Sequence, residues 1–174
     1  LREMKAEGQF VQDENPCLYL YELTMDGRSQ RGLVCCASVD DYLNQVIKKH
    51  ENTREDKEID RIRHVDICSA HTGPIFLAYR SNEGIREKIT EAVSRMPVYD
   101  FVSDDGIRHR VWKIEEEEWN LDICRRFGEL DSLYIADGHH RAASAVKVAL
   151  KRRKENPEYT GKEEFNYFLA VLFD

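Results

Sequence analysis

The sequence lacks the patterns that mark several common classes of protein. No apolar run in its 174 residues approaches the ~20 residues that a membrane-spanning helix needs, so we expect no membrane segment. The first residues, Leu1 to Gly8, are charged and contain no apolar stretch typical of a signal peptide. The motifs G-x-x-x-x-G-K-S/T and G-x-G-x-x-G, which cradle nucleotide phosphates, are also absent. We therefore expect a cytoplasmic protein without the commonest nucleotide-binding motifs.

Basic residues are too few to balance the acidic ones. The chain has 26 Lys and Arg against 33 Asp and Glu, which gives a net charge of −7 at pH 7. Proteins that bind nucleic acids through the phosphate backbone normally present a basic surface, so DNA and RNA are disfavoured as partners. Hydrophobic residues at 41% and charged residues at 34% are typical of a folded domain. We expect residues 1–174 to form a single domain, and the strand-like final residues indicate a segment of a longer protein.

The cysteines do not form a recognisable framework. Their number is odd and no C-x-x-C spacing occurs, which argues against both a set of disulfides and a structural zinc site. We interpret them as reduced thiols that fill apolar space. They are Cys17, Cys35, Cys36, Cys68 and Cys124.

Strand-forming residues around Asp-Gly turns predict two β-hairpins. One joins residues 18–23 to 32–37 through Asp26-Gly27, and the other joins residues 98–102 to 107–112. Further apolar strands are expected at residues 75–79, 132–136 and 167–173. Because hairpins alternate with helices, we predict a mixed α/β (α+β) fold with a mixed sheet and flanking helices.

Helical spacing and capping residues predict helices between these strands. The first begins after Ser38 and runs toward His50. The second follows Thr53 and has a narrow apolar stripe of Ile59, Ile62 and Val65. The other helices are expected between Asn82 and Pro97, at residues 115–126 and at residues 139–151.

The most informative stretch is the turn from strand to helix at Asp137-Gly138-His139-His140-Arg141. A strand that passes through glycine into a helix leaves backbone N–H groups unpaired at the positive end of the helix dipole. Such a helix start binds anions, and arginine can hold a phosphate through two hydrogen bonds. Two histidines and an arginine oppose the dipole there, which favours a bound phosphate over a simple turn capped by Asp137.

Two other interpretations of these residues remain open. Asp137 could only cap the turn, with the histidines partly exposed. His139 and His140 are a poor pair of metal ligands, because neighbouring helical residues point about 100° apart. Two single histidines, His64 and His71, are interpreted as surface or structural residues.

A second candidate site lies in the segment Lys48 to Thr53, which we place between two helices. His50 and Glu51 form a titratable pair beside the hydroxyl of Thr53 at a helix start. Glu51 is a candidate general base, because a carboxylate accepts a proton if its surroundings raise its pKa. The alternative is an exposed polar loop.

The chain resembles a family of conserved prokaryotic proteins filed as a domain of unknown function. The resemblance runs from about Cys17 to the end, and its specific part is the motif A-D-G-H-H-R at Ala136 to Arg141. The segments 49–53, 57–61 and 73–77 fit the same pattern. That family looks related to the archaeal ADP-dependent free serine kinase of the ParB/sulfiredoxin-like superfamily.

This resemblance implies a compact ParB/sulfiredoxin-like domain that holds nucleotide phosphates at Gly138, His139, His140 and Arg141. It also implies that Glu51 matches the catalytic glutamate of the kinase. Sulfiredoxin has a cysteine inside its phosphate turn, whereas this chain has histidine, so sulfinic acid reduction is disfavoured. ParB proteins bind CTP and DNA, and the net charge of −7 disfavours the DNA.

These observations lead to a first hypothesis of a nucleotide-dependent phosphotransferase acting on a small hydroxylated metabolite. Glu51 and His50 would serve catalysis, with Asp137 orienting a histidine or binding Mg²⁺ on the phosphates. ATP or ADP would bind at residues 138–141 with Thr53. The alternatives are a nucleotide-binding regulatory module without turnover and a ParB-like protein that associates with nucleic acid. The phosphate donor, the metal and the oligomeric state remain open.

Overall fold

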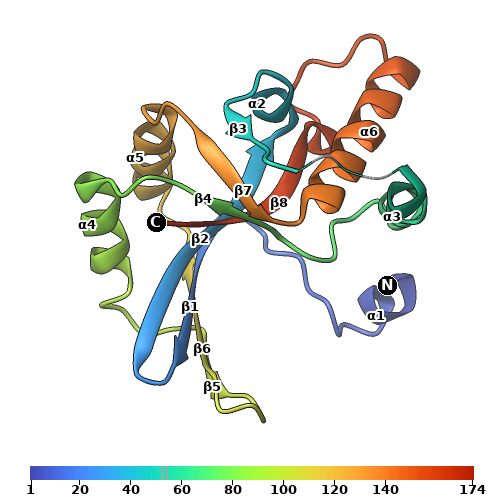
Figure 1. The fold of residues 1–174 in the computed structure, drawn as a ribbon. Coiled ribbons are helices and arrows are strands. Elements are labelled where there is room, and N and C mark those ends of the chain that lie inside the picture. Colours follow the sequence, from blue (N-terminus) through green and yellow to red (C-terminus); the bar gives the residue numbers. More distant parts are fainter. Residues whose placement is uncertain (52, 54) are drawn as a thin grey trace.

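A computed structural model describes residues 1–51, 53 and 55–174, and this description leaves out the side chains of residues 55–57. Helices surround one mixed sheet, which confirms the predicted mixed α/β class (Figure 1). The strands are β1 (Leu18–Met25), β2 (Arg28–Ser38), β3 (Ile47–Lys48), β4 (Ile75–Ala78), β5 (Tyr99–Val102), β6 (Arg108–Ile114), β7 (Leu133–Asp137) and β8 (Tyr167–Phe173). The helices are α1 (Arg2–Ala6), α2 (Val39–Leu43), α3 (Glu55–Cys68), α4 (Glu83–Ala92), α5 (Glu117–Gly128) and α6 (His139–Glu155), with a short 3-10 helix, η1 (Glu164–Asn166), before β8.

The described strands form an 8-stranded sheet in the order β3-β7-β4-β8-β2-β1-β6-β5. Two neighbouring pairs are parallel, β3 with β7 and β4 with β8, and the other pairs are antiparallel. Both predicted hairpins are present. Asp26 and Gly27 have φ angles of 49° and 77°, the left-handed backbone that a two-residue hairpin turn requires.

One face of the sheet carries the hydrophobic core. Leu33 on β2 pairs with Leu172 on β8, which pairs with Leu77 on β4, and all three side chains belong to one buried cluster. Trp119 and Ile123 of α5 belong to that cluster, together with buried apolar residues of α4 and α6. Helices α4, α5 and α6 therefore rest on a single apolar surface.

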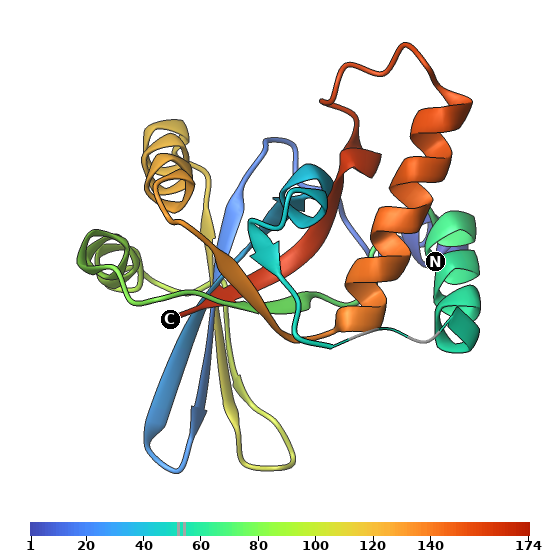
Figure 2. The ribbon, with the colours of Figure 1, turned by 45° about the horizontal axis from the view of Figure 1, so that its top comes forward.

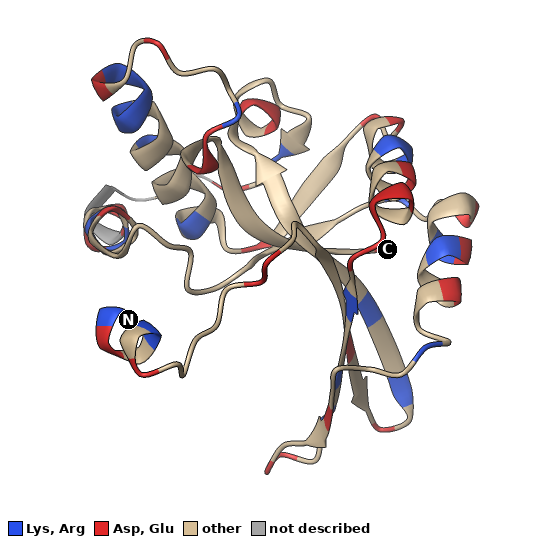
Figure 3. Cartoon of the chain, turned by 180° about the vertical axis from the view of Figure 1, so that it is seen from behind, with Lys and Arg blue, Asp and Glu red and all other residues tan. Residues whose placement is uncertain are grey.

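Helix α6 lies between the sheet and α3, and its small side chains make this position possible (Figure 2). Ala142, Ala145 and Ala149 are buried against the sheet cluster, while Ala143 and Ser144 are buried as well. Because these buried side chains are small, the helix can pack closely on both sides. The end of α6 is basic, as expected for a helix C-terminus, with Lys151 and Lys154 exposed and the two arginines between them partly buried (Figure 3).

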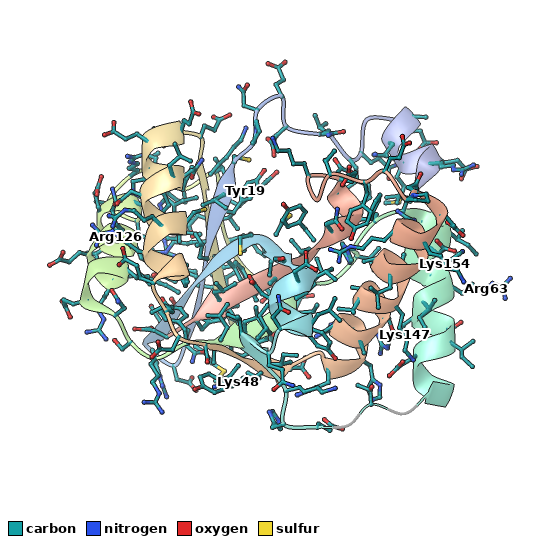
Figure 4. All side chains as sticks on the ribbon, turned by 90° about the horizontal axis from the view of Figure 1, so that it is seen from above. Tyr19, Lys48, Arg63, Arg126, Lys147 and Lys154 are labelled. Carbon is teal, nitrogen blue, oxygen red and sulfur yellow. The ribbon has the colours of Figure 1, made fainter. Side chains whose placement is uncertain are left out.

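Helix α3 is attached to α6 through polar contacts, and the predicted apolar stripe is wrong. Ile59 is 63% exposed, and Ile62 and Val65 are only partly buried. The contact instead includes ion pairs from Lys147 to Glu58 and from Lys151 to Asp66, the second at 2.6 Å. Figure 4 shows Lys147 in the space between the two helices.

The first predicted helix is much shorter than expected. Ser38 caps α2 by accepting a hydrogen bond from the N–H of Asp40, as predicted, but α2 ends at Leu43. Gln45 then takes a left-handed φ of 61°, and the chain continues into β3 beside β7. Ile47 and Lys48 thus form a strand where a helix was expected, and the side chain of Ile47 is buried in the core of the sheet.

Contrary to the prediction from the sequence, the cysteines do not all fill apolar space. All five cysteines are free thiols, and Cys36 and Cys124 are exposed rather than packed in the core. Among the helices described, none is sufficiently long and apolar to cross a membrane.

A buried carboxylate stabilises the middle of the hairpin strands. Glu22 on β1 is 1% exposed and lies directly opposite Arg31 on β2 and Arg110 on β6. Its oxygens accept hydrogen bonds from both guanidinium groups, at 2.6 Å from Arg31 Nε and 2.8 Å from Arg110 Nε. Burial raises the pKa of Glu22, but the two arginines outweigh that effect and hold it below its usual value.

We expect Glu22→Gln to lower the free energy of unfolding by about 2 kcal/mol at pH 7, because both charge-assisted hydrogen bonds weaken. Since the folded-state pKa is lowered, this contribution is present above the unfolded pKa and disappears as pH falls through the folded value. Urea titrations of both proteins at pH 7 and pH 3 measure the difference. Glu117→Gln, on the exposed start of α5, is the control and should change little. An equal loss at both pH values would contradict the ionic explanation.

Candidate functional site

The turn from β7 into α6 has the backbone that the sequence predicts. Gly138 has a φ of 93°, and a Cβ there would lie 2.9 Å from Nε of Arg141, so only glycine fits without strain. No side chain in the described part of the chain caps the helix start. The first N–H groups of α6 therefore have no capping partner at the positive end of the dipole, which is the arrangement of an anion site.

Arg141 is fixed beside this turn by Asp137. Its Nη2 donates a hydrogen bond of 2.7 Å to Oδ2 of Asp137, the last residue of β7. Its Nε is buried and has no hydrogen-bond partner among the described residues. Asp137 therefore orients Arg141, whereas the sequence leads us to expect that it orients a histidine. The guanidinium retains donor capacity for a second acceptor.

His139 joins the two segments singled out in the sequence. Its side chain is 5% exposed, and its ring meets that of His50 edge-on with centroids 4.4 Å apart. Its Nδ1 is 3.7 Å from Oε2 of Glu51, too far for a hydrogen bond, and Glu51 itself is 60% exposed. The Nε2 of His139 is buried without a partner in the described part of the chain. We refer to His50, Glu51 and His139 as the His139 cluster.

Strand β3 explains why these distant segments meet. It pairs in parallel with β7, with Ile47 opposite Leu133 and Lys48 opposite Tyr134. Parallel strands end at the same edge of a sheet, so the residues after β3 reach the residues after β7. His50 and Glu51 therefore follow a strand, and their expected position between two helices is wrong.

The environment of His139 favours a neutral imidazole. Burial lowers its pKa, and the nearby His50 and His140 lower it further, while Glu51 and Asp137 act in the opposite direction without reversing the shift. From the sequence we expect His139 to be one of several cations at the helix start. In the structure Arg141 is the permanent cation there, and His139 supplies a neutral ring.

The other side of the α6 start opens into a cavity of about 940 Å³ between α3 and α6. His140, Arg141 and Ser144 of α6 line one wall of this α3–α6 cavity, and Arg61 and His64 of α3 line another. His140 Nδ1 and the fully buried Ser144 Oγ have no hydrogen-bond partner among the residues described. These unpaired atoms and the basic side chains make the cavity suited to an anion.

Thr53 contacts α3 and is not among the residues of the His139 cluster. Its hydroxyl donates to Glu58, a residue of α3 that is 2% exposed and pairs with Lys147. Burial raises the pKa of Glu58, but the hydrogen bonds from Lys147 and Thr53 and the charges of Lys147 and His140 outweigh it and lower the value. Glu58 thus connects Thr53 to Lys147 of α6.

Sequence reasoning missed three residues near this site. His64 and His71 both line the α3–α6 cavity, although each stands alone in the sequence. His71 is also structural, because its Nε2 donates to the carbonyl of Tyr167 at 3.2 Å. Nothing in the sequence distinguishes Glu58 from the other acidic residues of its helix. The spacing of His140 and Ser144, four residues apart before an alanine-rich stretch, is a signal that both lie on one helical face.

The two histidines of the motif face different surroundings, as the 100° angle between helical neighbours requires. His139 contacts the residues after β3, and His140 lines the α3–α6 cavity. In the described part of the chain, no group of three or more His, Cys, Asp or Glu residues is placed to hold a metal ion.

The fold and the candidate site define a mixed α/β protein in which a sheet strand passes through Gly138 into a helix start without a side-chain cap among the described residues. The chain belongs to the DUF1015 family of proteins of unknown function, whose family model matches residues 1–174. Searches of the curated proteins and of the solved structures gave no match.

The His139 cluster predicts opposite effects of two substitutions on one pKa. We expect His50→Ala to raise the pKa of His139, because it removes a neighbouring positive charge and part of the burial. We expect Glu51→Gln to lower it, because it removes a carboxylate that favours the imidazolium. NMR titration of the His139 ring signals measures both shifts. Shifts of the same sign, or no shift in either variant, would show that the three residues do not form a cluster.

Proposed function

We propose that this protein is a nucleotide-dependent phosphotransferase that acts on a small hydroxylated metabolite, with free serine as the first substrate to test. One observation carries the proposal: β3 brings Glu51 to the start of α6, beside the anion site. Phosphoryl transfer needs phosphate positioning, charge stabilisation and a group that accepts the proton of the attacking hydroxyl. The two segments together contain residues suited to each of these tasks.

The phosphates of ATP or ADP would bind at the first turn of α6. The N–H groups after Gly138 and the free Nε of Arg141 would donate to phosphate oxygens, and His140 would add a donor from the cavity wall. Thr53 would lie on the α3 side, through its hydrogen bond to Glu58. A neutral His139 fits this arrangement, because it donates or accepts a hydrogen bond without opposing the helix dipole.

Glu51 would accept the proton of the substrate hydroxyl. Its exposed carboxylate can reach a bound substrate, and the pair of rings of His50 and His139 forms a rigid surface beside it. Asp137 would hold Arg141 in position and present its exposed carboxylate to Mg²⁺. Bound Mg²⁺ would neutralise part of the phosphate charge.

A nucleotide-binding regulatory module without turnover is the second candidate. It is favoured by the 3.7 Å separation between Glu51 and His139, because no hydrogen bond from that ring fixes the carboxylate. It shares the phosphate site with the first candidate and differs only in the role of Glu51. The net charge of −7 disfavours a ParB-like association with nucleic acid, because the phosphate backbone is negative too.

Arg141→Ala should weaken the binding of ADP and ATP about 10- to 100-fold, the usual loss for a charge-assisted hydrogen bond. Isothermal titration calorimetry with Mg²⁺ present measures the affinity. Arg80→Ala, an exposed arginine after β4, is the matched control and should bind as the unaltered protein does. Unchanged affinity in a folded Arg141→Ala variant would remove the phosphate assignment, whatever the reaction.

Glu51→Gln should reduce turnover about 10²- to 10⁴-fold, because the general base is lost, and leave nucleotide affinity unchanged. The assay incubates the protein with Mg²⁺, ATP or ADP and free serine, and detects phosphoserine by mass spectrometry. Glu117→Gln serves again as the exposed control. Full activity in Glu51→Gln would exclude the role as base, and nucleotide binding without product in the unaltered protein would favour the regulatory module.

A further inference from the structure

A second large cavity lies in another part of the molecule, between α5 and the segment that joins α2 to β3. Its volume is about 1060 Å³, and its floor is formed by β2 and β8. Leu33, Leu172 and Phe127 contribute apolar surface, and residues 12–19 form the rim. Tyr19, labelled in Figure 4, lies in the opening between α5 and α2. We call this space the α5–α2 cavity. It shares none of its lining residues with the α3–α6 cavity.

The charged residues around the α5–α2 cavity all have the same sign. Among the residues that the structure describes, its lining contains Asp and Glu side chains but no Lys, Arg or His. Asp13 is neutralised by Lys113, 2.7 Å away. The others form no ion pair with a residue that the structure describes. They are Glu14, Asp41, Asp131 and Glu164.

Asp41 lies in a partly buried position, with no cation paired to it among the residues that the structure describes. Burial raises its pKa, and the nearby Asp40 raises it further. Asp40 itself is paired with Arg153, so that arginine does not face the cavity. An apolar floor with an unbalanced negative rim attracts a ligand that is apolar at one end and positive at the other.

We infer that the α5–α2 cavity is a ligand site separate from the anion site, and that it takes a small organic cation with an apolar body. The cavity volume lies near the upper end of the range of pockets that hold drug-sized ligands, about 300–1,000 Å³. The apolar part would lie on Leu33, Leu172 and Phe127, and the cationic group would lie among Asp41, Asp131 and Glu164. The inference does not depend on phosphotransferase activity, because it uses none of the residues of the His139 cluster.

Three compounds of one shape test the charge requirement by calorimetry. They are 4-phenylbutylammonium, 4-phenylbutanol and 4-phenylbutyrate, which are close in size and differ mainly in charge. We expect the cation to bind roughly tenfold more tightly than the alcohol, and the carboxylate to bind more weakly than both. Equal binding of all three, or binding of none, would overturn the inference.

A variant without the three carboxylates assigned to the cationic group supplies the matched control. In Asp41→Asn/Asp131→Asn/Glu164→Gln, the affinity for the cation should fall to that for the alcohol, while alcohol binding is retained. Retained alcohol binding also shows that the variant is folded. An unchanged preference for the cation would overturn the assignment of these carboxylates.

The cysteines report where the compound binds. Cys36 and Cys124 line the α5–α2 cavity, whereas Cys68 lines the α3–α6 cavity. The bound cation should slow alkylation of Cys36 and Cys124 by iodoacetamide at pH 8.5, with Cys68 unaffected, as measured by mass spectrometry of the digested protein. Protection of Cys68 alone, or of no cysteine, would place the compound elsewhere and contradict the inference.

Discussion

The left-handed backbone of Gly138 determines how the chain leaves the sheet and enters its longest helix. A φ of 93° turns the chain sharply, so that α6 begins immediately after β7 without a capping side chain. The same turn brings Nη2 of Arg141 to 2.7 Å from Oδ2 of Asp137. A Cβ on Gly138 would lie only 2.9 Å from Nε of that arginine, so the turn leaves no room for a side chain. The orientation of His139 and His140 follows from where the helix begins. One backbone angle thus positions the unpaired N–H groups, the arginine and both histidines.

Helix α6 separates two chemical environments that the sequence presents as one motif. His139 contacts the residues after β3, and His140 faces the α3–α6 cavity together with Ser144. Burial makes His139 a neutral ring, whereas the opposite side is surrounded by arginines. In the proposed reaction, this division places proton transfer on one side of the helix start and phosphate binding on the other. The α5–α2 cavity, with its negative rim, adds a third environment elsewhere on the same sheet.

The sequence predicts those parts of the fold that short-range chemistry determines. The Asp26-Gly27 turn, the cap at Ser38 and the glycine at 138 each act within a few residues, and all three are found where expected. Strand β3 escapes prediction because it has two residues, too few for a recognisable alternation, and forms only because β7 is beside it. For the same reason, the spacing of residues in the sequence does not predict the contact between His50 and His139. The cavity walls depend on pairs such as Glu58 with Lys147, which belong to distant segments.

The attachment of α3 has a consequence for the cavity that it borders. Ile59 and Ile67 of this helix are exposed, and its contacts with α6 include ion pairs through Lys147 and Lys151. The side chain of Lys151 is 51% exposed, so its attraction to Asp66 weakens as the salt concentration rises, whereas the pair of Lys147 with the buried Glu58 is screened much less. Ionic strength can therefore adjust the distance between α3 and α6, and with it the width of the α3–α6 cavity, mainly where Lys151 meets Asp66, while the sheet and its core stay unchanged.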